Sequence, residues 1–287
     1  MGRVIGLELV KIGKRRLTWA LLLLLIGSIA ALLLGFYALI AGGKVPIEGA
    51  DGREAAASAL LPHFILPGVV PEALGMAQGL GGWLLVILTA VAVGMEEGYG
   101  TVRVMLGAGL GRTRYLTAKL GALLVVTVAF VAAALGVGVV SALIIAVAAR
   151  TPITPLPVGG PAFVDSVGMA LRTIGVLCFS VALTFGATVL SRSQVIGMAV
   201  GLGASLVDTV AAGVLPLLGA AGRSLSPIVP GRDIAAVMAL NHFGPASIPL
   251  DLPTIPVAVL ALLGYATLFI GGSWLVFRRR DITSGAG

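Results

Sequence analysis

Residues Glu96–Lys119 read EEGYGTVRVMLGAGLGRTRYLTAK and separate two strongly apolar runs of the chain. The stretch is too polar to cross a lipid bilayer, and its basic residues flank an apolar run as they do on the cytoplasmic side of membrane proteins. Thr101 can cap a short helix whose apolar side holds Val102, Leu106 and Met105. The glycines at positions 107, 109 and 111 are expected to end this helix and form a hinge. The pattern predicts a short, rigidly held cytoplasmic helix that suits docking of a soluble partner.

Outside this stretch the composition is that of an integral membrane protein. The chain is 58% hydrophobic and 11% charged, and its mean hydropathy is +1.09. A spanning helix needs about 20 apolar residues, and continuous apolar runs favour helices over a closed barrel, whose strands alternate. We therefore expect an all-α membrane protein in which residues 1–287 form a single transmembrane domain. Six transmembrane helices are predicted, at residues 17–40, 79–95, 120–149, 173–190, 195–218 and 256–277.

Basic residues gather on one side of this predicted topology. If the spans alternate, 13 of the 19 Lys and Arg residues flank them on one side, whereas 8 of the 12 Asp and Glu residues lie on the other side or within the spans. Cytoplasmic loops of membrane proteins carry the excess of Lys and Arg. The distribution predicts a multi-pass protein of the cell membrane with both termini in the cytoplasm. It gives no support to a nucleic-acid partner, although the net charge is +7.

The segment before the first span, residues 1–16, has the periodicity of an interfacial amphipathic helix. Ile5, Leu9 and Ile12 share one face. The opposite face is expected to hold Glu8, Lys11, Lys14 and Arg15. Lysine and arginine on such a helix reach anionic lipid headgroups. The alternative is a simple basic anchor that sets the topology.

Three proline- or glycine-rich connections are expected on the external side. Residues 41–78 carry three prolines in their second half, which is too broken for a span, and residues 151–161 form a short rigid link. Residues 219–255 are expected to contain a short helix at Asp233–Leu240. The third span, about 45 Å long as a helix against a hydrocarbon core of about 30 Å, must tilt, bend or project beyond the lipid.

Polar residues inside the fourth and fifth spans are candidates for a translocation path. Thr173, Ser180 and Thr184 form a stripe on the fourth span, which either packs against another helix or lines the path. The fifth span begins with small residues at positions 197, 201 and 205, a spacing that permits close approach of helices. Asp208 lies on that same face, and an acid within a membrane span is costly unless it is paired or hydrated.

The sequence contains no motif for chemistry of its own. No Gly-x-x-x-x-Gly-Lys-Ser/Thr loop is present to cradle a phosphate. We predict no catalytic, cofactor or metal site, because the spans contain neither a Ser, His and acid cluster nor a pair of histidines at ligand spacing. Cys178 is the only cysteine, so an intrachain disulfide is not possible. The chain is therefore not expected to be an enzyme, and energy for any transport must come from a partner or from an ion gradient.

The central stretch resembles a known family. An acidic residue before Gly100 and Thr101, followed by Arg103, Leu106, Gly107, Arg112 and Lys119, is similar to the membrane-spanning subunits of ABC-2 type transporters. In that family the segment is a coupling helix that docks on a separate ATPase subunit. The resemblance implies an ATPase-coupling set of Glu96, Glu97, Gly100, Thr101, Arg103, Gly107, Arg112 and Lys119.

The same resemblance implies a permease subunit that exports an unidentified substrate. The partner ATPase would bind ATP and Mg, and two copies of the chain would pair as a homodimer. Three alternatives stay open. The stretch can be a solvated loop that binds nothing; the chain can be an ATP-independent secondary transporter or channel that uses Asp208; or it can be a membrane anchor or signalling subunit that transports nothing.

Overall fold

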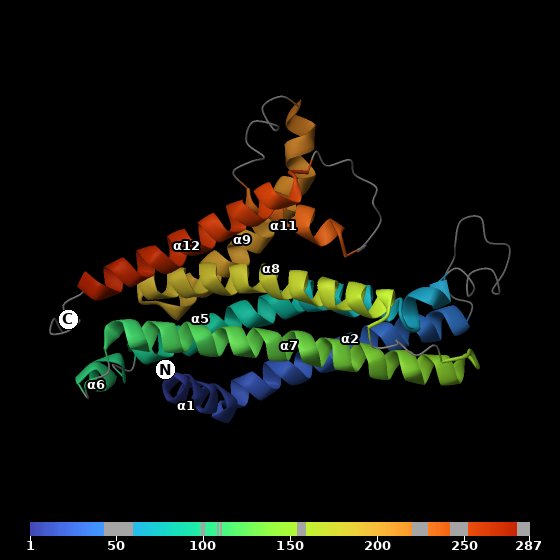
Figure 1. Ribbon diagram of the computed structural model, residues 1–287, viewed down its shortest axis with the longest axis horizontal. Coiled ribbons are helices and arrows are strands. Elements are labelled where there is room, and N and C mark those ends of the chain that lie inside the picture. The colour runs from blue at the N-terminus through green and yellow to red at the C-terminus, as the bar shows by residue number, and fades with distance from the viewer. Residues whose placement is uncertain are drawn as a thin grey trace.

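The structure is a computed structural model that describes residues 1–42, 60–98, 101–107, 109, 111–153, 159–219, 229–241 and 252–279. Every regular element in these residues is a helix (Figure 1). The elements are α1 (Gly2–Lys14), α2 (Arg16–Ala41), α4 (Val69–Met76), the π-helical turn η1 (Ala77–Gly81), α5 (Gly82–Gly98), α6 (Thr101–Gly107), α7 (Arg112–Ala148), α8 (Pro161–Ser191), α9 (Gln194–Val214), the 3-10 turn η2 (Leu215–Leu218), α11 (Pro230–Ala239) and α12 (Ile255–Arg279).

The protein is an all-α membrane protein with several spans. Five helical stretches are long and apolar enough to cross a bilayer: α2, the continuous stretch Val69–Gly98, α7, α8 and α12. The sixth predicted span begins with α9, of which Gln194–Asp208 is an apolar helical stretch shorter than the other five. Large apolar side chains on α2 and α12 point outward, among them Leu23, Leu260 and Leu268, as expected of surfaces that contact lipid.

The long helices lie side by side, with α5, α7 and α8 in the middle of the bundle (Figure 1). The first helix α1, the short helix α6 and the C-terminal end of α12 all lie at one end, which we call the α6 end. Arg112 at the start of α7 and the end of α12 meet there, because the Arg112 guanidinium donates a hydrogen bond to the carbonyl of Arg278. The charge pattern predicted that these basic helix ends lie on the same side of the membrane, and in the structure they lie close together.

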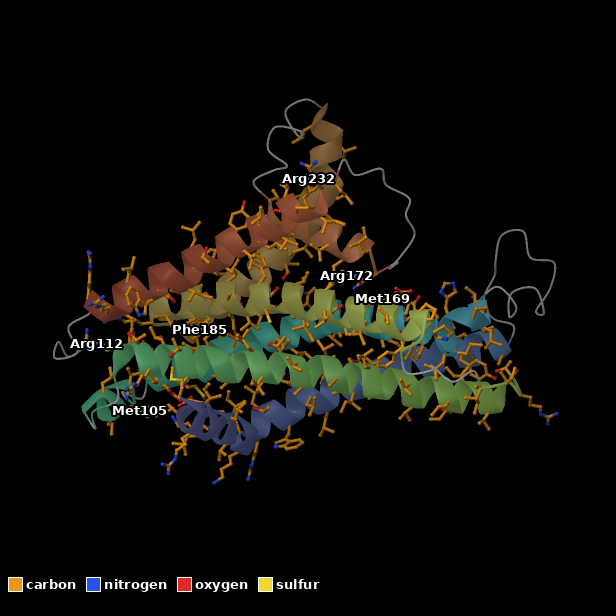
Figure 2. The ribbon with its side chains drawn as sticks, in the orientation of Figure 1. Met105, Arg112, Met169, Arg172, Phe185 and Arg232 are labelled. Atoms are coloured by element: carbon orange, nitrogen blue, oxygen red, sulfur yellow. The ribbon has the colours of Figure 1, made fainter. Side chains whose placement is uncertain are left out.

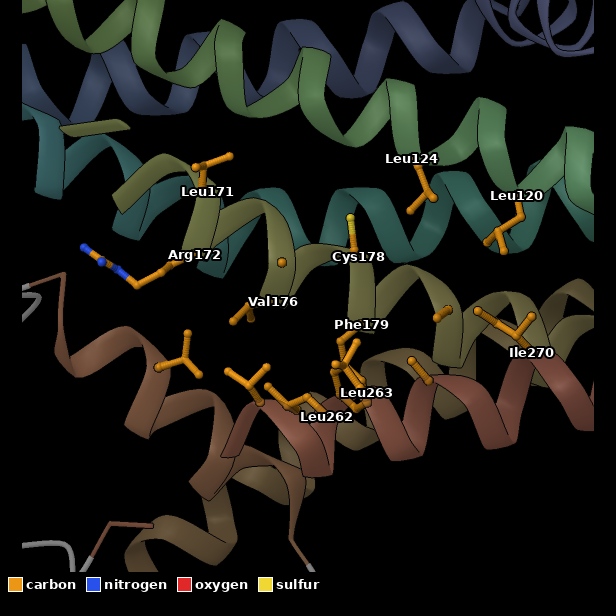
Figure 3. A pocket seen from close by; sticks show the side chains of 15 residues that line it. Leu120, Leu124, Leu171, Arg172, Val176, Cys178, Phe179, Leu262, Leu263 and Ile270 are labelled. Carbon is orange, nitrogen blue, oxygen red and sulfur yellow. The ribbon is translucent and has the colours of Figure 1, made fainter. Parts of the chain in front are cut away.

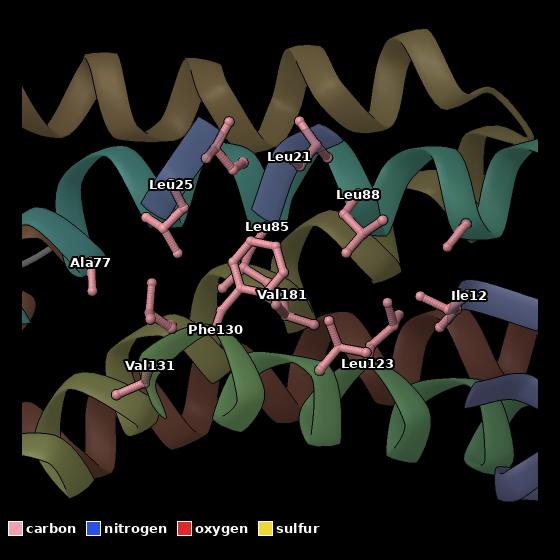
Figure 4. Close-up of a cluster of buried hydrophobic side chains, with 14 of the residues drawn as sticks. Ile12, Leu21, Leu25, Ala77, Leu85, Leu88, Leu123, Phe130, Val131 and Val181 are labelled. Carbon is pink, nitrogen blue, oxygen red and sulfur yellow. The ribbon is translucent and has the colours of Figure 1, made fainter. Parts of the chain in front are cut away.

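The main core lies between α2, α5, α7 and α8 (Figure 4). Leu25, Leu85, Leu88 and Phe130 are almost completely buried in it. Lipid tails are as apolar as these side chains, so close packing rather than exclusion from water holds spanning helices together.

Glycines permit the closest helix contacts. A Cβ on Gly94 of α5 would lie 2.7 Å from the backbone nitrogen of Gln194 at the start of α9. A Cβ on Gly197 or Gly201 of α9 would overlap Thr188 or Thr184 of α8. The close approach predicted from the small-residue spacing of the fifth span is therefore confirmed.

Two spans begin earlier than the sequence predicts. The helix of the second span starts at Val69 rather than at residue 79. Pro71 lies in the first turn of this helix. The N–H groups of a first turn have no acceptor within the helix, so a proline there removes no helical hydrogen bond. The fourth span starts at Pro161 rather than at residue 173, again with the proline in the first turn. Parts of the expected external segments 41–78 and 151–161 are thus helix; residues 43–59 and 154–158 lie outside the described residues.

Other boundaries agree closely with the predictions. Helices α2 and α12 match the first and last predicted spans to within a few residues. The helix expected at Asp233–Leu240 is α11, which starts three residues earlier at Pro230. The third span is one continuous helix of 37 residues, about 55 Å at 1.5 Å per residue, so it projects beyond a bilayer core of about 30 Å.

Candidate functional site

The predicted short helix is present as α6, between α5 and α7. Its side chains divide as expected: Val102 is buried in the main core, and Met105 and Leu106 pack against it. Val104, on the opposite side, is 71% exposed. Helix α6 is therefore held to the bundle by one face and presents the other at the α6 end.

Glycines form the predicted hinge after α6. The helix ends at Gly107, and Gly109 has φ +88°, in the left-handed region that side chains with a Cβ rarely adopt. Gly111 is extended and starts α7. The chain thus turns from α6 into the long helix α7 within four residues.

Beside α6 lies a set of charged side chains and one tyrosine that we call the charged junction: Glu8, Lys11, Arg15, Glu96, Tyr115 and Lys119. Its centre is Lys119 of α7, whose Nζ lies 2.5 Å from Oε2 of Glu96 and 3.1 Å from Oε2 of Glu8. The Tyr115 hydroxyl donates to Oε2 of Glu96 at 2.7 Å. The Lys119 ammonium thus joins a carboxylate of α1 to a carboxylate of α5.

Two further cations complete the charged junction from α1 and its end. Lys11 Nζ lies 2.5 Å from Oε1 of Glu8 and 3.7 Å from Oε1 of Glu96. Arg15 lies 3.9 Å from Oε1 of Glu96 and donates to the carbonyl of Val91 at 3.3 Å. Lys11 also contacts the sulfur of Met105 in α6, at 3.6 Å from Nζ. The charged junction therefore connects α1, α5, α6 and α7.

The centre of the charged junction is closed to solvent. The side chains of Lys119, Glu8 and Glu96 are 2%, 5% and 6% exposed, whereas those of Lys11 and Arg15 are partly exposed. A buried ion pair is costly to desolvate, and removing one partner leaves a charge without compensation. The buried ion pairs therefore tie α1, α5 and α7 together rather than adding charge to the surface.

This geometry corrects the predicted orientation of α1. The sequence placed Glu8 and Lys11 on a polar face opposite Ile12, but Glu8 and Ile12 are both buried against the bundle. Leu7 and Val10 are instead 64% and 52% exposed. Helix α1 is rotated relative to the prediction because Glu8, its one acidic residue, pairs with Lys119. Lys119 belongs to α7, so the helical periodicity of α1 alone could not predict this pairing.

The predicted coupling residues have separate places in the structure. Glu96 and Lys119 come together, but inside the charged junction rather than on the surface. Arg112 lies at the surface beside the end of α12, whereas Met105 lies beside α1 (Figure 2). Glu97 is partly buried at the end of α5, and Thr101 and Gly107 bound α6. Gly100 and the side chain of Arg103 lie outside the described residues.

The residues predicted to line a translocation path lie on α8 and α9. Thr173 and Thr184 are completely buried, and the hydroxyls of Thr173, Ser180 and Thr184 each donate to the carbonyl four residues earlier. Asp208 lies on α9, where its carboxylate accepts a hydrogen bond of 3.0 Å from the N–H of Gly231 and so joins α9 to α11.

Sequence reasoning missed the roles of Glu8, Lys11, Arg15 and Tyr115. One signal was present, because Glu8 is the only acid among the first 16 residues and stands on an otherwise basic helix. Glu8, Lys11 and Arg15 also lie at spacings of three and four residues, which share one side of a helix. Tyr115 carried no such signal.

No protein-family model and no curated protein matches this sequence. Function must therefore be inferred from the geometry. In the described part of the chain, no three His, Cys, Asp or Glu side chains are placed to hold a metal ion. What the α6 end offers is a short helix with one exposed face, packed on the core through Val102 and lying beside the buried ion pairs that join α1, α5 and α7.

Proposed function

We propose that the chain is the membrane-spanning subunit of an ABC-2 type exporter, and that α6 is the helix on which a separate ATPase subunit docks. ATP and Mg would be bound by that partner. A movement of the ATPase would push α6, and the charged junction would transmit the push to α1, α5 and α7.

The observation that carries this proposal is the attachment of α6. A helix of seven residues has little stability alone, yet α6 is fixed through Val102 and linked to Lys11 of the charged junction through Met105. Its outer face carries Val104, an apolar side chain that is 71% exposed at a polar end of the molecule. Single exposed apolar residues are common on protein surfaces, so Val104 marks the free face of α6 and the position at which contact with a partner is tested. Glu96 and Lys119 then act behind the interface, not in it.

The proposal includes the finer topology. We infer that α9 together with η2 makes a sixth crossing, that the α6 end is cytoplasmic, and that two copies pair so that each presents one α6 to one ATPase. The positive charges at the α6 end support the orientation. The exported substrate would cross between the two copies.

Site-specific crosslinking in cells tests the docking. A photoreactive amino acid at position 104 should give an adduct whose captured protein binds and hydrolyses ATP. The matched position is Val164, at the start of α8, which is 59% exposed at the other end of the molecule. Capture of the same ATPase from position 164, or of no ATPase from position 104, would contradict the proposal.

A further inference from the structure

An elongated cavity of about 470 Å³ lies between α7, α8 and α12, with α11 at one end (Figure 3). This volume is within the range of small-molecule sites, roughly 300–1,000 Å³. Of the 15 residues that line it, all are apolar, glycine or cysteine except Arg172. Leu171 and Leu263 on its rim are 63% and 57% exposed. The cavity therefore opens toward the lipid-facing side of the bundle.

Arg172 is fixed at one end of the cavity, and Leu120 and Ile270 lie at the other (Figure 3). Its Nε donates to Oδ1 of Asn241 at 2.6 Å, and its Nη2 lies 3.4 Å from the carbonyl of Leu240. Asn241 is itself completely buried and held by Thr173. These partners are neutral, and Arg172 has no ion pair among the described residues. A full positive charge is thus held in place at the head of an apolar groove.

The position of Arg172 along α8 sets its depth in a bilayer. Twenty residues of α8 separate it from Arg192 in the turn at the α6 end, about 30 Å at 1.5 Å per residue, which equals the hydrocarbon thickness. The spacing therefore suits a placement of Arg172 at the membrane–water interface opposite the α6 end. From Arg172, the lining residues of α8 continue to Ala182, about 15 Å along the helix, which is the depth of one leaflet's hydrocarbon layer.

We propose that this groove is a specific site for an anionic membrane phospholipid, with the phosphate on the Arg172 guanidinium and one acyl chain along the apolar wall. Arginine pairs with phosphate through charge-assisted hydrogen bonds, and an anionic headgroup, unlike phosphatidylcholine, brings no cation close to the Arg172 guanidinium. The apolar lining, the lateral opening and the length of one leaflet all fit an acyl chain. The site belongs to the leaflet opposite the α6 end and does not depend on the ATPase proposal.

Two substitutions in the groove test recognition of the lipid headgroup separately from binding of the acyl chain. Arg172→Gln removes the charge but keeps the groove. Gly175→Phe fills the groove, because Gly175 lines it and a Cβ there meets no atom within 4 Å. Arg150→Gln is the matched control, since Arg150 is an exposed arginine after the end of α7 that does not line the groove.

Native mass spectrometry of the detergent-purified chain, titrated with phosphatidylglycerol or phosphatidylcholine, counts the lipids retained. We expect one tightly held phosphatidylglycerol per chain. Arg172→Gln should weaken its retention relative to phosphatidylcholine by roughly ten- to hundredfold, the range expected of a charged hydrogen bond. Gly175→Phe should remove one bound lipid of either kind, and Arg150→Gln should change nothing.

Other outcomes would overturn the assignment. Equal retention of phosphatidylglycerol by wild type and Arg172→Gln would show that the groove holds ordinary bilayer lipid without recognition. Displacement of the lipid by glycerol phosphate, which has no chain, would indicate a site for soluble anions. A shift from dimer to monomer mass in Gly175→Phe, with lipid counts per chain unchanged, would show that a second copy occupies the groove.

Discussion

Replacing Lys119 with methionine keeps an unbranched side chain one heavy atom shorter and removes the cation at the centre of the charged junction. The carboxylates of Glu8 and Glu96 are each about 95% buried. Without Lys119, Glu96 would lose its shortest ion pair and Glu8 its second shortest. Breaking a buried pair in this way costs about 3–5 kcal/mol. Lys11 stays 2.5 Å from Glu8, and it offsets part of the loss, so we expect about 3 kcal/mol. This amount is a large fraction of the stability of an ordinary domain.

The assay is unfolding of the purified protein by SDS in mixed micelles, followed by circular dichroism. Lys14→Met is the matched control. It also removes one positive charge by a lysine-to-methionine change, but Lys14, on α1, is exposed. Such surface substitutions change the free energy of unfolding by no more than about 0.5 kcal/mol. The double variant Glu8→Gln with Lys119→Met should lose less than the sum of the two single variants, because neither residue then leaves the other unpaired. A loss in Lys119→Met no greater than in Lys14→Met would refute the structural role of the charged junction.

Three further predictions follow from the helix contacts and the charge pattern. Gly94→Val should lower the SDS midpoint strongly because its Cβ would lie 2.7 Å from Gln194 backbone atoms, whereas Gly136→Ala, with nothing within 4 Å, should not; equal midpoints would contradict the close α5–α9 contact. In a Cys178→Ala background, a cysteine at exposed Asp165 should react with an impermeant thiol reagent in intact cells and one at exposed Thr113 should not; labelling at position 113 alone would invert the topology. Asp208→Asn keeps an acceptor for Gly231 and should preserve stability, whereas Asp208→Leu should lose about 1 kcal/mol; a stable Asp208→Leu would argue against the α9–α11 contact.

The elements that sequence predicted well are those whose signals are local. Thr101 and the glycines from Gly107 onward bound α6 because helix starts and stops depend on residues within a few positions. The predicted starts of the second and fourth spans were wrong because of prolines. In the sequence, Pro71 and Pro161 look like helix breaks, yet a helix tolerates a proline in its first turn, where both residues lie.

The charged junction could not be predicted in the same way. The helical periodicity of residues 1–16 predicts two faces but not which of them packs against the bundle. The packed face is the one that carries Glu8, because Glu8 pairs with Lys119, 111 residues away in the sequence. Likewise Glu96 and Lys119 were both assigned to the α6 site, but their burial depends on how α1 covers them. The position of Arg172 at the head of a groove depends on α11 and α12, which no local pattern relates to it.

The most direct test of the central claim is the amount of ATP hydrolysis that co-purifies with the tagged chain, measured per chain for wild type, Val104→Glu and Val164→Glu. Both substitutions place a charge on an exposed valine, at opposite ends of the molecule. If an ATPase docks on α6, the activity should accompany wild type and Val164→Glu and be lost from Val104→Glu, while all three proteins keep the same SDS midpoint. Equal activity with Val104→Glu, or none with wild type, would contradict the assignment of α6 as the coupling helix.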